Sequence, residues 1–451
     1  MAGDDEKGGN DHGEFKRSLT FWKLCALTFA SVAGGPYGFE EAVGAGGPYL
    51  TIIGLLLIPF IWSVPNALMT AELACMMPEN GGHILWVDRA FGSFWSFLNS
   101  YATLFSLIFE GGLYPVMFMD YVGELLGKEY SGGVRITIGI VVIVLVTVVN
   151  IFGTDIVGNF SIAFTVASLG PFILIILLGG SNIDVYDIVQ VHVPPQTIEW
   201  GTFITILLWS TSGFDLVGAC AGEVENPGKT FPAALSFAMA LTLTIDVLSM
   251  VTGMSVVTDY ENWHDGTFMD VAEILGGKVL TTTFVFGAAI SVIGLLCTLL
   301  CSSSRIIYGM AMVGTLPRVF AKTNVKYGTP HVAIIGNALL MMCVLFLPFA
   351  ALAEGEMWFY SVSTIMKFGA LCQLRKTMPD RHRPYRIPMS DRAVNWYCII
   401  PTALCCVMLV VVKNDTLIIG AVGITISIIA YFISTKIVGA KDLINFDVLD
   451  E

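Results

Sequence analysis

Long runs of apolar residues, separated by short polar segments, dominate the hydropathy pattern of this chain. A transmembrane helix needs about 20 consecutive apolar residues to cross a hydrocarbon core of about 30 Å. On that basis the sequence predicts an all-α membrane protein with twelve transmembrane helices. The predicted spans are 21–46, 49–76, 92–121, 133–152, 156–179, 200–221, 232–257, 280–312, 331–350, 354–374, 394–412 and 415–437.

Two of these spans, the first and the sixth, contain helix-breaking residues near their middle. The first span carries four breakers within five positions, Gly34, Gly35, Pro36 and Gly38. One glycine costs a helix about 1 kcal/mol and one proline about 3 kcal/mol, so four together predict an unwound turn. The break in the sixth span has a single glycine, Gly213, after three hydroxyl residues whose side chains can bond freed backbone groups. Because unpaired backbone is costly in lipid, such breaks persist where they face a cavity that holds a solute.

The two broken spans stand in matching places of the chain. Spans one to five form one unit and spans six to ten another, and the units begin on opposite sides of the membrane. This arrangement predicts a five-plus-five inverted repeat with broken first and sixth helices. We therefore expect a transport core over 21–374 and a loop with two further helices over 375–437. A disordered cytosolic tail is predicted over 1–20 and a second cytosolic tail over 438–451.

Charged residues are few and unevenly placed. They make up 13% of the 451 residues, against about 25% in soluble proteins. With the N-terminus inside, every lysine and arginine falls in a cytosolic segment except five: Lys128, Arg135, Lys278, Lys413 and the intramembrane Lys367. This asymmetry predicts cytosolic termini at both ends. We expect a multi-pass protein of the plasma membrane.

The composition also narrows the partners and the chemistry. A net charge of −13 argues against nucleic acid as a partner. The sequence has no Walker-type phosphate loop, so an ion or substrate gradient is the expected energy source. The cysteines lack metal-ligand spacing, and the loop 122–132 has none for a disulfide-linked accessory subunit. No nucleophile–base or metal set points to an enzyme. We expect no cofactor and no metal, with a small solute and the lipid bilayer as partners.

Acidic residues inside the predicted spans are the main candidates for solute binding, because an intramembrane carboxylate needs a partner or a proton. Glu40 and Glu41 follow the first break, and we expect Glu40 to face the cavity, since adjacent residues on a helix diverge. Glu110 lies in the third span, and Asp215 follows the second break. Glu223, near the cytosolic end of the sixth span, is either a gate or a helix-end charge.

The sequence leaves the roles of two further intramembrane charges undecided. We take Asp246 as the lone charge of the seventh span and Lys367 as the lone charge of the tenth. Neither is expected to face lipid. Lys367 either extends toward cytosolic water or pairs with a carboxylate.

Aromatic residues beside the breaks are candidates for enclosing a bound ammonium group, because a ring face attracts cations. The candidates are Tyr37, Phe39, Tyr101, Trp209 and Phe214.

Four groups of motifs make the chain resemble the amino acid–polyamine–organocation transporter superfamily. They are Ala-Glu-Leu at 71–73 with Met-Pro-Glu-Asn-Gly-Gly at 77–82; Ser-Gly-Phe-Asp at 212–215 with Gly-Glu-Val-Glu-Asn-Pro at 222–227; Ser-Arg at 304–305 with Tyr-Gly-Met-Ala at 308–311 and Leu-Pro at 316–317; and Leu-Arg at 374–375 with Met-Pro at 378–379 and Arg-Pro-Tyr-Arg-Ile-Pro at 383–388. The resemblance implies that superfamily's five-plus-five inverted-repeat fold. The segments 34–41, 113–116 and 120–121 are similar to the proton-coupled polyamine transporters of plants and protozoa, which carry an acid at the place of Glu110.

The resemblance implies a secondary active transporter that imports polyamines such as putrescine and spermidine by proton symport. It suggests amine-binding roles for Glu40, Glu110 and Asp215. The full predicted substrate-binding set is Gly34, Gly35, Tyr37, Gly38, Glu40, Tyr101, Glu110, Trp209, Ser212, Phe214 and Asp215, with Glu110 and Glu223 as candidates for proton coupling or gating.

The alternative is a cationic or neutral amino-acid transporter or exchanger of the same superfamily. Its substrate would place a carboxylate on the backbone amides of 34–38. Two features favour this alternative: Ser-Gly-Phe-Asp at 212–215 is the pattern of general amino-acid carriers, and Lys367 stands where the polyamine group often has an acid. A receptor without transport activity is a third candidate.

Overall fold

The computed structural model describes residues 17–32, 35–126, 130–189 and 197–438. Within these ranges the regular structure is helical, apart from one bridge between Leu19 and Val224. The helices are α1 (Phe21–Val32), α2 (Glu40–Ile58), α3 (Val64–Met76), α4 (His83–Phe91), α5 (Ser93–Leu126), α6 (Gly132–Ile151), α7 (Thr154–Gly179), α8 (Val185–Ile188), α9 (Trp200–Ser210), α10 (Pro227–Val256), α11 (Thr267–Met312), α12 (His331–Met342), α13 (Phe349–Thr377), α14 (Asp391–Val411) and α15 (Asn414–Val438). A π-helical turn, η1 (Pro59–Ser63), joins α2 to α3, and a 3₁₀ segment, η3 (Leu216–Glu223), follows α9.

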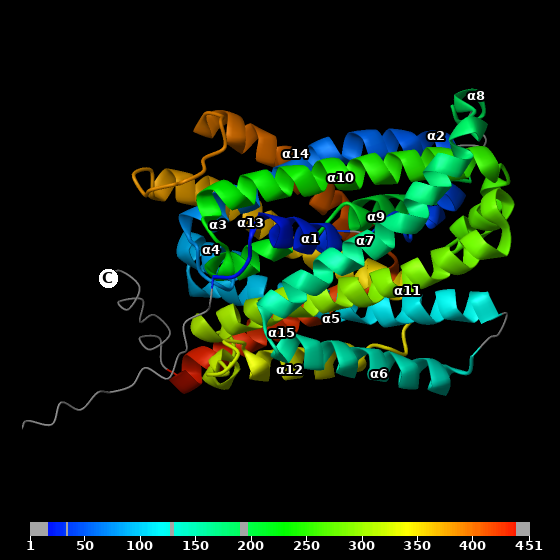
Figure 1. Cartoon of the computed structure of the whole chain (residues 1–451). Coiled ribbons are helices and arrows are strands. Elements are labelled where there is room, and N and C mark those ends of the chain that lie inside the picture. The colour runs from blue at the N-terminus through cyan, green and yellow to red at the C-terminus, as the bar shows by residue number, and fades with distance from the viewer. Residues whose placement is uncertain (1–16, 33–34, 127–129, 190–196, 439–451) are drawn as a thin grey trace, which may run out of the picture.

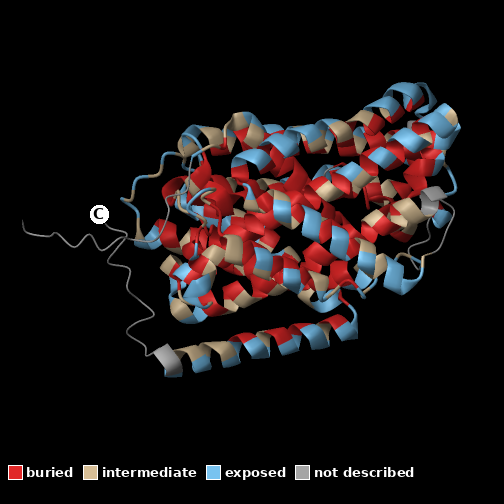
Figure 2. Ribbon diagram, turned by 60° about the horizontal axis from the view of Figure 1, so that its bottom comes forward, coloured by how far each residue is buried: buried red, intermediate tan, exposed pale blue. Residues whose placement is uncertain are grey.

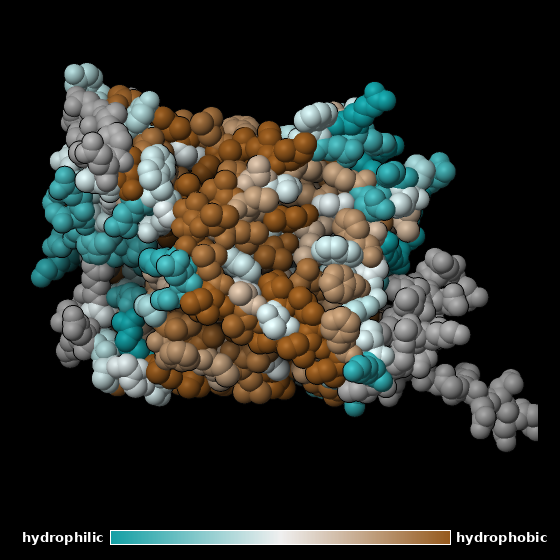
Figure 3. All heavy atoms as spheres, turned by 180° about the vertical axis from the view of Figure 1, so that it is seen from behind, coloured by the Kyte–Doolittle hydropathy of each residue, from teal (hydrophilic) through white to brown (hydrophobic). Residues whose placement is uncertain are grey.

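On the face of the helical bundle shown in Figure 3, a broad apolar belt crosses the middle and hydrophilic side chains gather at the two ends. In the described part of the chain, eight helical segments are long and apolar enough to cross a membrane. Three shorter apolar helices, α1, α9 and α12, accompany them. Buried residues fill the interior, whereas many side chains on the outside of the helices are exposed (Figure 2). Large apolar residues such as Leu177 and Val410 are among the exposed ones, as expected of a surface that contacts lipid. The protein is therefore an integral membrane protein.

The eighth, ninth and tenth predicted spans differ most from the helices observed. Helix α11 begins at Thr267, 13 residues before the predicted start of its span at 280. Helix α12 ends at Met342, eight residues before the predicted end of its span at 350, and the chain then turns. Helix α13 begins at Phe349 instead of 354, and it contains buried Glu354 and Glu356. Our prediction that Lys367 is the lone charge of this helix is therefore wrong. These charges also lower the hydropathy of α13, which is why length and composition do not mark it as a span.

Both predicted interruptions are present. The first separates α1, which ends at Val32, from α2, which begins at Glu40. Gly35 and Gly38 in this segment have φ of 126° and 83°, where a side chain is disfavoured. The second separates α9 from η3, and Gly213 within it has φ of 100°. Glycine and proline therefore break both helices at the predicted places.

Helix α1 lies inside the bundle, packed against α7, α10 and α11 (Figure 1). The residues that precede α1 are also hydrogen-bonded to the bundle. The amides of Ser18 and Leu19 donate to the Glu223 carbonyl at 3.0 and 2.9 Å, and the Glu225 amide donates to the Leu19 carbonyl at 3.0 Å. Residues 17–20, which we predicted within the N-terminal tail, thus belong to the folded bundle.

Candidate functional site

The two interruptions lie against each other in the middle of the bundle. A Cβ atom added to Gly213 would stand only 2.1 Å from the carbonyl oxygen of Ser31, near the end of α1. Glycine is therefore required at this crossing for space as well as for its φ angle. Because both segments are unwound where they meet, their backbone N–H and C=O groups lie near the same enclosed region.

Side chains satisfy much of the freed backbone at the second interruption, as its hydroxyl residues predicted. Thr211 Oγ1 donates to the Leu207 carbonyl at 2.7 Å, and Ser212 Oγ donates to the Leu208 carbonyl at 2.6 Å. Neighbouring η1 contributes as well, because Ser63 Oγ donates to the Thr211 carbonyl at 2.8 Å. Trp62 Nε1 donates to Ser212 Oγ at 2.9 Å. These hydrogen bonds connect the unwound turn to α9 and η1.

Two adjoining cavities border the interruptions and share Glu110, Leu216 and Tyr360 as lining residues. One is also lined by His83, Thr103, Ser106, Leu107, Asp215, Ser363 and Lys367. The other is also lined by Ser31, Val32, Tyr114, Trp209, Ser212, Gly213 and Glu356. We call Glu110, Asp215, Glu356 and Lys367 the central acidic site. Its charged groups come from α5, from the second interruption and from α13.

Asp215 pairs with Lys367 within this site. Lys367 Nζ lies 2.5 Å from Asp215 Oδ2, and the Tyr360 hydroxyl donates to Asp215 Oδ1 at 2.5 Å. The ammonium group also lies 4.1 Å from the centre of the Tyr360 ring. Both charged side chains are 1% exposed. The structure therefore decides the question left open for Lys367, which pairs with a carboxylate and does not reach toward water.

The other two acids of the site have neutral hydrogen-bond partners. The Tyr114 hydroxyl donates to Glu110 Oε1 at 3.0 Å. Ser106 Oγ donates to Glu356 Oε1 at 3.1 Å, whereas Glu356 Oε2 is buried without a partner. Among the described lining residues there are three carboxyl groups, one lysine and one histidine. The site is therefore short of positive charge, which a cationic ligand or protons can supply.

Glu40 lies apart from these acids, contrary to our expectation that it faces the same cavity. Its side chain is fully buried, and Oε2 accepts from the Gly38 amide at 2.8 Å, so it closes the first unwound turn. It lies beside Asp265 in the loop before α11. Burial raises the pKa of Asp265 to about 6, while the Tyr121 hydroxyl, at 3.0 Å, acts in the opposite direction. Glu41 is only partly buried, so the two adjacent glutamates do diverge.

The aromatic candidates separate into different surroundings. Trp209 lines the cavity that contains Glu110 and Glu356, and it packs against Gly38 and Phe349. Tyr37 is buried among aromatic rings, including that of Phe172 at 4.8 Å, and it does not line these two cavities.

Two other aromatic candidates and Gly35 lie outside the lining of these two cavities. Tyr101 packs against Phe97 and is absent from the lining of both cavities. Phe214 lines a third cavity, described below. Gly35 packs close to Tyr37 and Phe172, whereas Gly34 lies outside the described residues.

Glu223 belongs to a separate buried network. Arg305 Nε donates to its Oε1 at 2.8 Å, and Asn80 Nδ2 donates to the same oxygen at 2.9 Å. Thr154 bonds to the other carboxylate oxygen. Since its charge is fully paired, Glu223 fastens α7, η3 and α11 together and is not a free helix-end charge.

Sequence reasoning missed several members of the site. Glu356, Tyr114, Tyr360 and His83 were not proposed, although all four line the cavities. Glu356 carried a usable signal, because it is an acid inside the predicted span 354–374. Tyr114 also had one, since it follows Glu110 by four residues and so shares its helix face. Tyr360 and His83 had none, because only the packing of distant helices brings them to Asp215.

An apolar belt around a helical bundle, with charged groups enclosed beside two interrupted helices, is the construction of a membrane transporter. Comparison with known proteins agrees with this class. The amino acid permease family model matches residues 19–433, and the chain belongs to that family.

Relatives extend over most of the chain. A probable polyamine transporter of Arabidopsis thaliana is 34% identical over 436 residues, covering 95% of this chain and 90% of its own. The polyamine transporter PUT1 of Oryza sativa subsp. japonica is 34% identical, covering 90% and 76%. The serine/threonine exchanger SteT of Bacillus subtilis is more distant, at 26% identity over 74% and 77% of the two chains.

Proposed function

We propose that this protein imports polyamines such as putrescine and spermidine across the plasma membrane by proton symport. In this proposal twelve transmembrane helices form a five-plus-five inverted repeat with two added helices, and both termini lie in the cytosol. The broken first and sixth helices are α1 with the start of α2, and α9 with η3. The amine is bound at the central acidic site, and Glu110 couples binding to a proton.

The surplus of carboxyl groups in the central acidic site carries this proposal. Lys367 neutralises only Asp215, which leaves Glu110 and Glu356 without a basic partner among the described residues. Two buried acids without counter-charges favour two positive charges from elsewhere. A diamine supplies two ammonium groups joined by an apolar chain, and Trp209 and Leu216 offer apolar surface to that chain.

The first interruption is less suited to the amino-acid alternative. A substrate carboxylate was expected to bind the backbone amides of 34–38. In the structure the Gly38 amide already donates to the carboxylate of Glu40 at 2.8 Å. A second carboxylate at this turn would also have to fit beside the buried carboxyl group of Glu40. The site therefore favours a ligand with ammonium groups and no carboxylate.

The names of the relatives support the same substrate class. The Arabidopsis and rice relatives at 32–35% identity are named polyamine transporters or probable polyamine transporters. The bacterial relatives named as amino-acid exchangers or transporters are 25–26% identical.

A competition assay in proteoliposomes tests the proposal. Uptake of radiolabelled putrescine is measured with an inward proton gradient, and unlabelled spermidine, arginine or leucine is added in excess. We expect a strong dependence on the gradient and strong inhibition by spermidine, with little inhibition by either amino acid. Inhibition by arginine or leucine, with spermidine inactive, would favour the amino-acid alternative instead.

Cadaverine and a monoamine of equal chain length form a matched control pair. Because the proposal assigns one acid to each ammonium group, the monoamine should compete at least about tenfold less well, which corresponds to about 1.4 kcal/mol. Equal inhibition by both amines would contradict the two-acid arrangement.

A further inference from the structure

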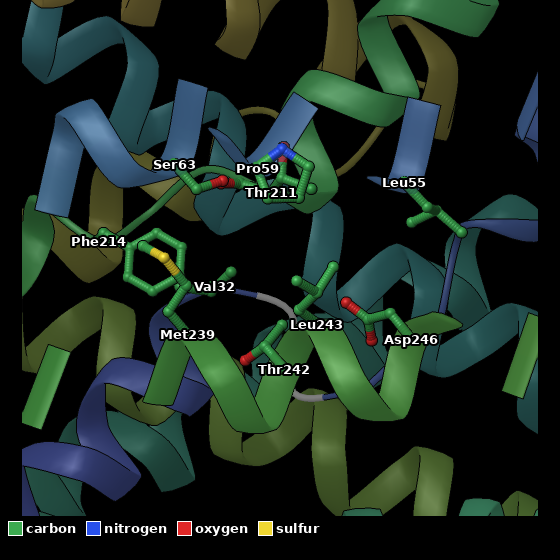
Figure 4. Close-up of a pocket in the computed structure, with 10 residues that line it drawn as sticks. All are labelled: Val32, Leu55, Pro59, Ser63, Thr211, Phe214, Met239, Thr242, Leu243 and Asp246. Carbon is green, nitrogen blue, oxygen red and sulfur yellow. The ribbon is translucent and has the colours of Figure 1, made fainter. Parts of the chain in front are cut away.

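A third cavity lies on the other side of the second interruption and contains Asp246. It is enclosed by α1, α2, η1, the second interruption and α10. Figure 4 shows its lining residues, which are Val32, Leu55, Pro59, Ser63, Thr211, Phe214, Met239, Thr242, Leu243 and Asp246. The Asp246 carboxyl group projects from α10 toward Leu243 and Leu55 (Figure 4). This cavity is otherwise mainly apolar.

The carboxyl group of Asp246 has no compensating charge. The residue is 2% exposed, and its Oδ1 atom is buried without a hydrogen-bond partner. The hydroxyl of Thr242, which lines the same cavity, is also buried without a partner. No lysine, arginine or histidine is among the lining residues. A charged carboxylate in such a place is costly, because the lining offers no basic side chain and Oδ1 has no hydrogen-bond partner.

The charged groups of the helices that pack against α10 are engaged elsewhere. Lys23 of α1 pairs with Asp155 of α7, Glu72 of α3 with Arg375, and Arg305 of α11 with Glu223. Glu40 and Glu41 at the start of α2 lie near Asp265. The remaining charges of α11 before Arg305 are Asp270, Glu273 and Lys278, near its start. None of these groups lines the Asp246 cavity.

The cavity shares a wall with the central acidic site. Val32, the last residue of α1, lines both the Asp246 cavity and the cavity of Glu110 and Glu356. The second interruption contributes Thr211 and Phe214 to one side and Ser212 and Gly213 to the other. Any movement of the two unwound segments during transport must therefore alter the surroundings of Asp246.

We propose that Asp246 is a proton-binding site, separate from the acids that bind the amine. The proton comes from water and adds to a carboxylate oxygen, which leaves a neutral carboxyl group. The neutral form suits the closed, mainly apolar cavity of the described conformation. The ionised form needs water, so losing the proton favours a conformation in which the cavity opens at the second interruption. Proton binding at Asp246 is thus linked to the movement of the unwound segments.

Transport by the Asp246→Asn variant tests this site, and this test relies on the proposed function for its substrate. Asparagine imitates the protonated acid. We expect accumulation of putrescine driven by a proton gradient to fall at least tenfold, while putrescine exchange at equal pH stays within twofold of wild type. Asp246→Glu, which keeps a titratable group, should retain part of the driven uptake. Unchanged driven uptake by the Asn variant would overturn the proposal, and so would equal loss of exchange in a folded variant.

Chemical labelling of the wild-type protein provides a test that needs neither a variant nor a substrate. A hydrophobic carbodiimide reacts with protonated carboxyl groups, and mass spectrometry of the peptides locates the adduct. We expect labelling of Asp246 that declines as pH rises, with the ion-paired Asp215 as the unlabelled internal comparison. Absence of labelling at every pH would overturn the proposal. Protection of Asp246 by Na⁺ at constant pH would also overturn it, by assigning the site to a metal cation.

The two tests separate this site from the proposed function. If wild-type protein does not transport putrescine, the proposed function fails, yet pH-dependent labelling of Asp246 still supports the proton site. If wild-type transport is proton-driven and Asp246→Asn is indistinguishable from it, only the proton site fails.

Discussion

The buried acids of this protein have two contrasting kinds of partner. In the two arginine networks, Glu72 with Arg375 and Glu223 with Arg305, each acid has a buried guanidinium partner. The Glu72 carboxylate has two further partners: it forms an ion pair with Arg383 and accepts a hydrogen bond from the Ile387 amide. In the central acidic site, Glu110 and Glu356 have only hydroxyl partners.

The difference separates structural charges from charges that are kept for a ligand. A paired carboxylate and guanidinium satisfy each other, so neither attracts a further ion. An acid whose partners are hydroxyl groups is not neutralised, so it attracts a cation or a proton. Its burial lowers the stability of the folded protein. Removing a charge should therefore destabilise the protein in the arginine networks and impair transport in the central acidic site.

The largest expected effect is the loss of stability in Arg375→Ala. This change removes the main guanidinium partner of the buried Glu72 and leaves Arg383 Nε, at 3.3 Å, as its remaining basic contact. Breaking a buried ion pair in this way typically costs about 3–5 kcal/mol. Thermal unfolding in detergent should show a large fall in the midpoint, or little folded protein should be recovered. Asp391→Asn is the matched control, because Asp391 contacts the same arginine but its side chain is 51% exposed. That control should change stability by less than about 1 kcal/mol. Equal stability of Arg375→Ala and wild type would contradict the structural role.

The second expected effect is the loss of transport in Glu110→Gln, with stability preserved. Glutamine keeps the shape and accepts the Tyr114 hydrogen bond but cannot attract an ammonium group. We expect putrescine uptake to fall at least about tenfold, or about 1.4 kcal/mol. The unfolding midpoint and surface expression should stay unchanged or rise, because an unpaired buried acid is removed. Normal uptake would refute the role assigned to Glu110, and Tyr114→Phe shows how much of the loss comes from the hydrogen bond alone.

The smallest expected effect concerns Asp265, a partly buried acid of the loop before α11. Burial raises its pKa from the ordinary 3.8 to about 6 in the folded protein. The folded state therefore holds its proton more tightly, so stability falls as pH rises from about 4 to above 6. Asp265→Asn should remove this fall. The full shift corresponds to about 3 kcal/mol, but solvent screens a partly exposed carboxyl, so we expect a gain on the order of 1 kcal/mol at pH 8 and little at pH 4. Unfolding midpoints at both pH values check this, and a gain of the same size at pH 4 would disprove the pH linkage.

The sequence predicted the interruptions better than it predicted the surroundings of the acids. Both breaks follow from local backbone chemistry, because glycine and proline act on their own turn of helix. Asp215 and Lys367, by contrast, are 152 residues apart and meet only when the second interruption packs against α13. Glu40 was expected at the cavity, yet it bonds to the amide of Gly38, which depends on the exact path of the unwound turn.

By itself, the sequence determined that the chain is a helical membrane protein with two broken helices and acids inside its apolar segments. Hydropathy and helix-breaking residues fix these features because each acts over a few neighbouring positions. The tertiary structure decided which acids are neutralised, which remain without a basic partner and which cavity each one faces. That assignment depends on side chains from separate helices meeting within about 3 Å, a distance that packing sets and local pattern does not.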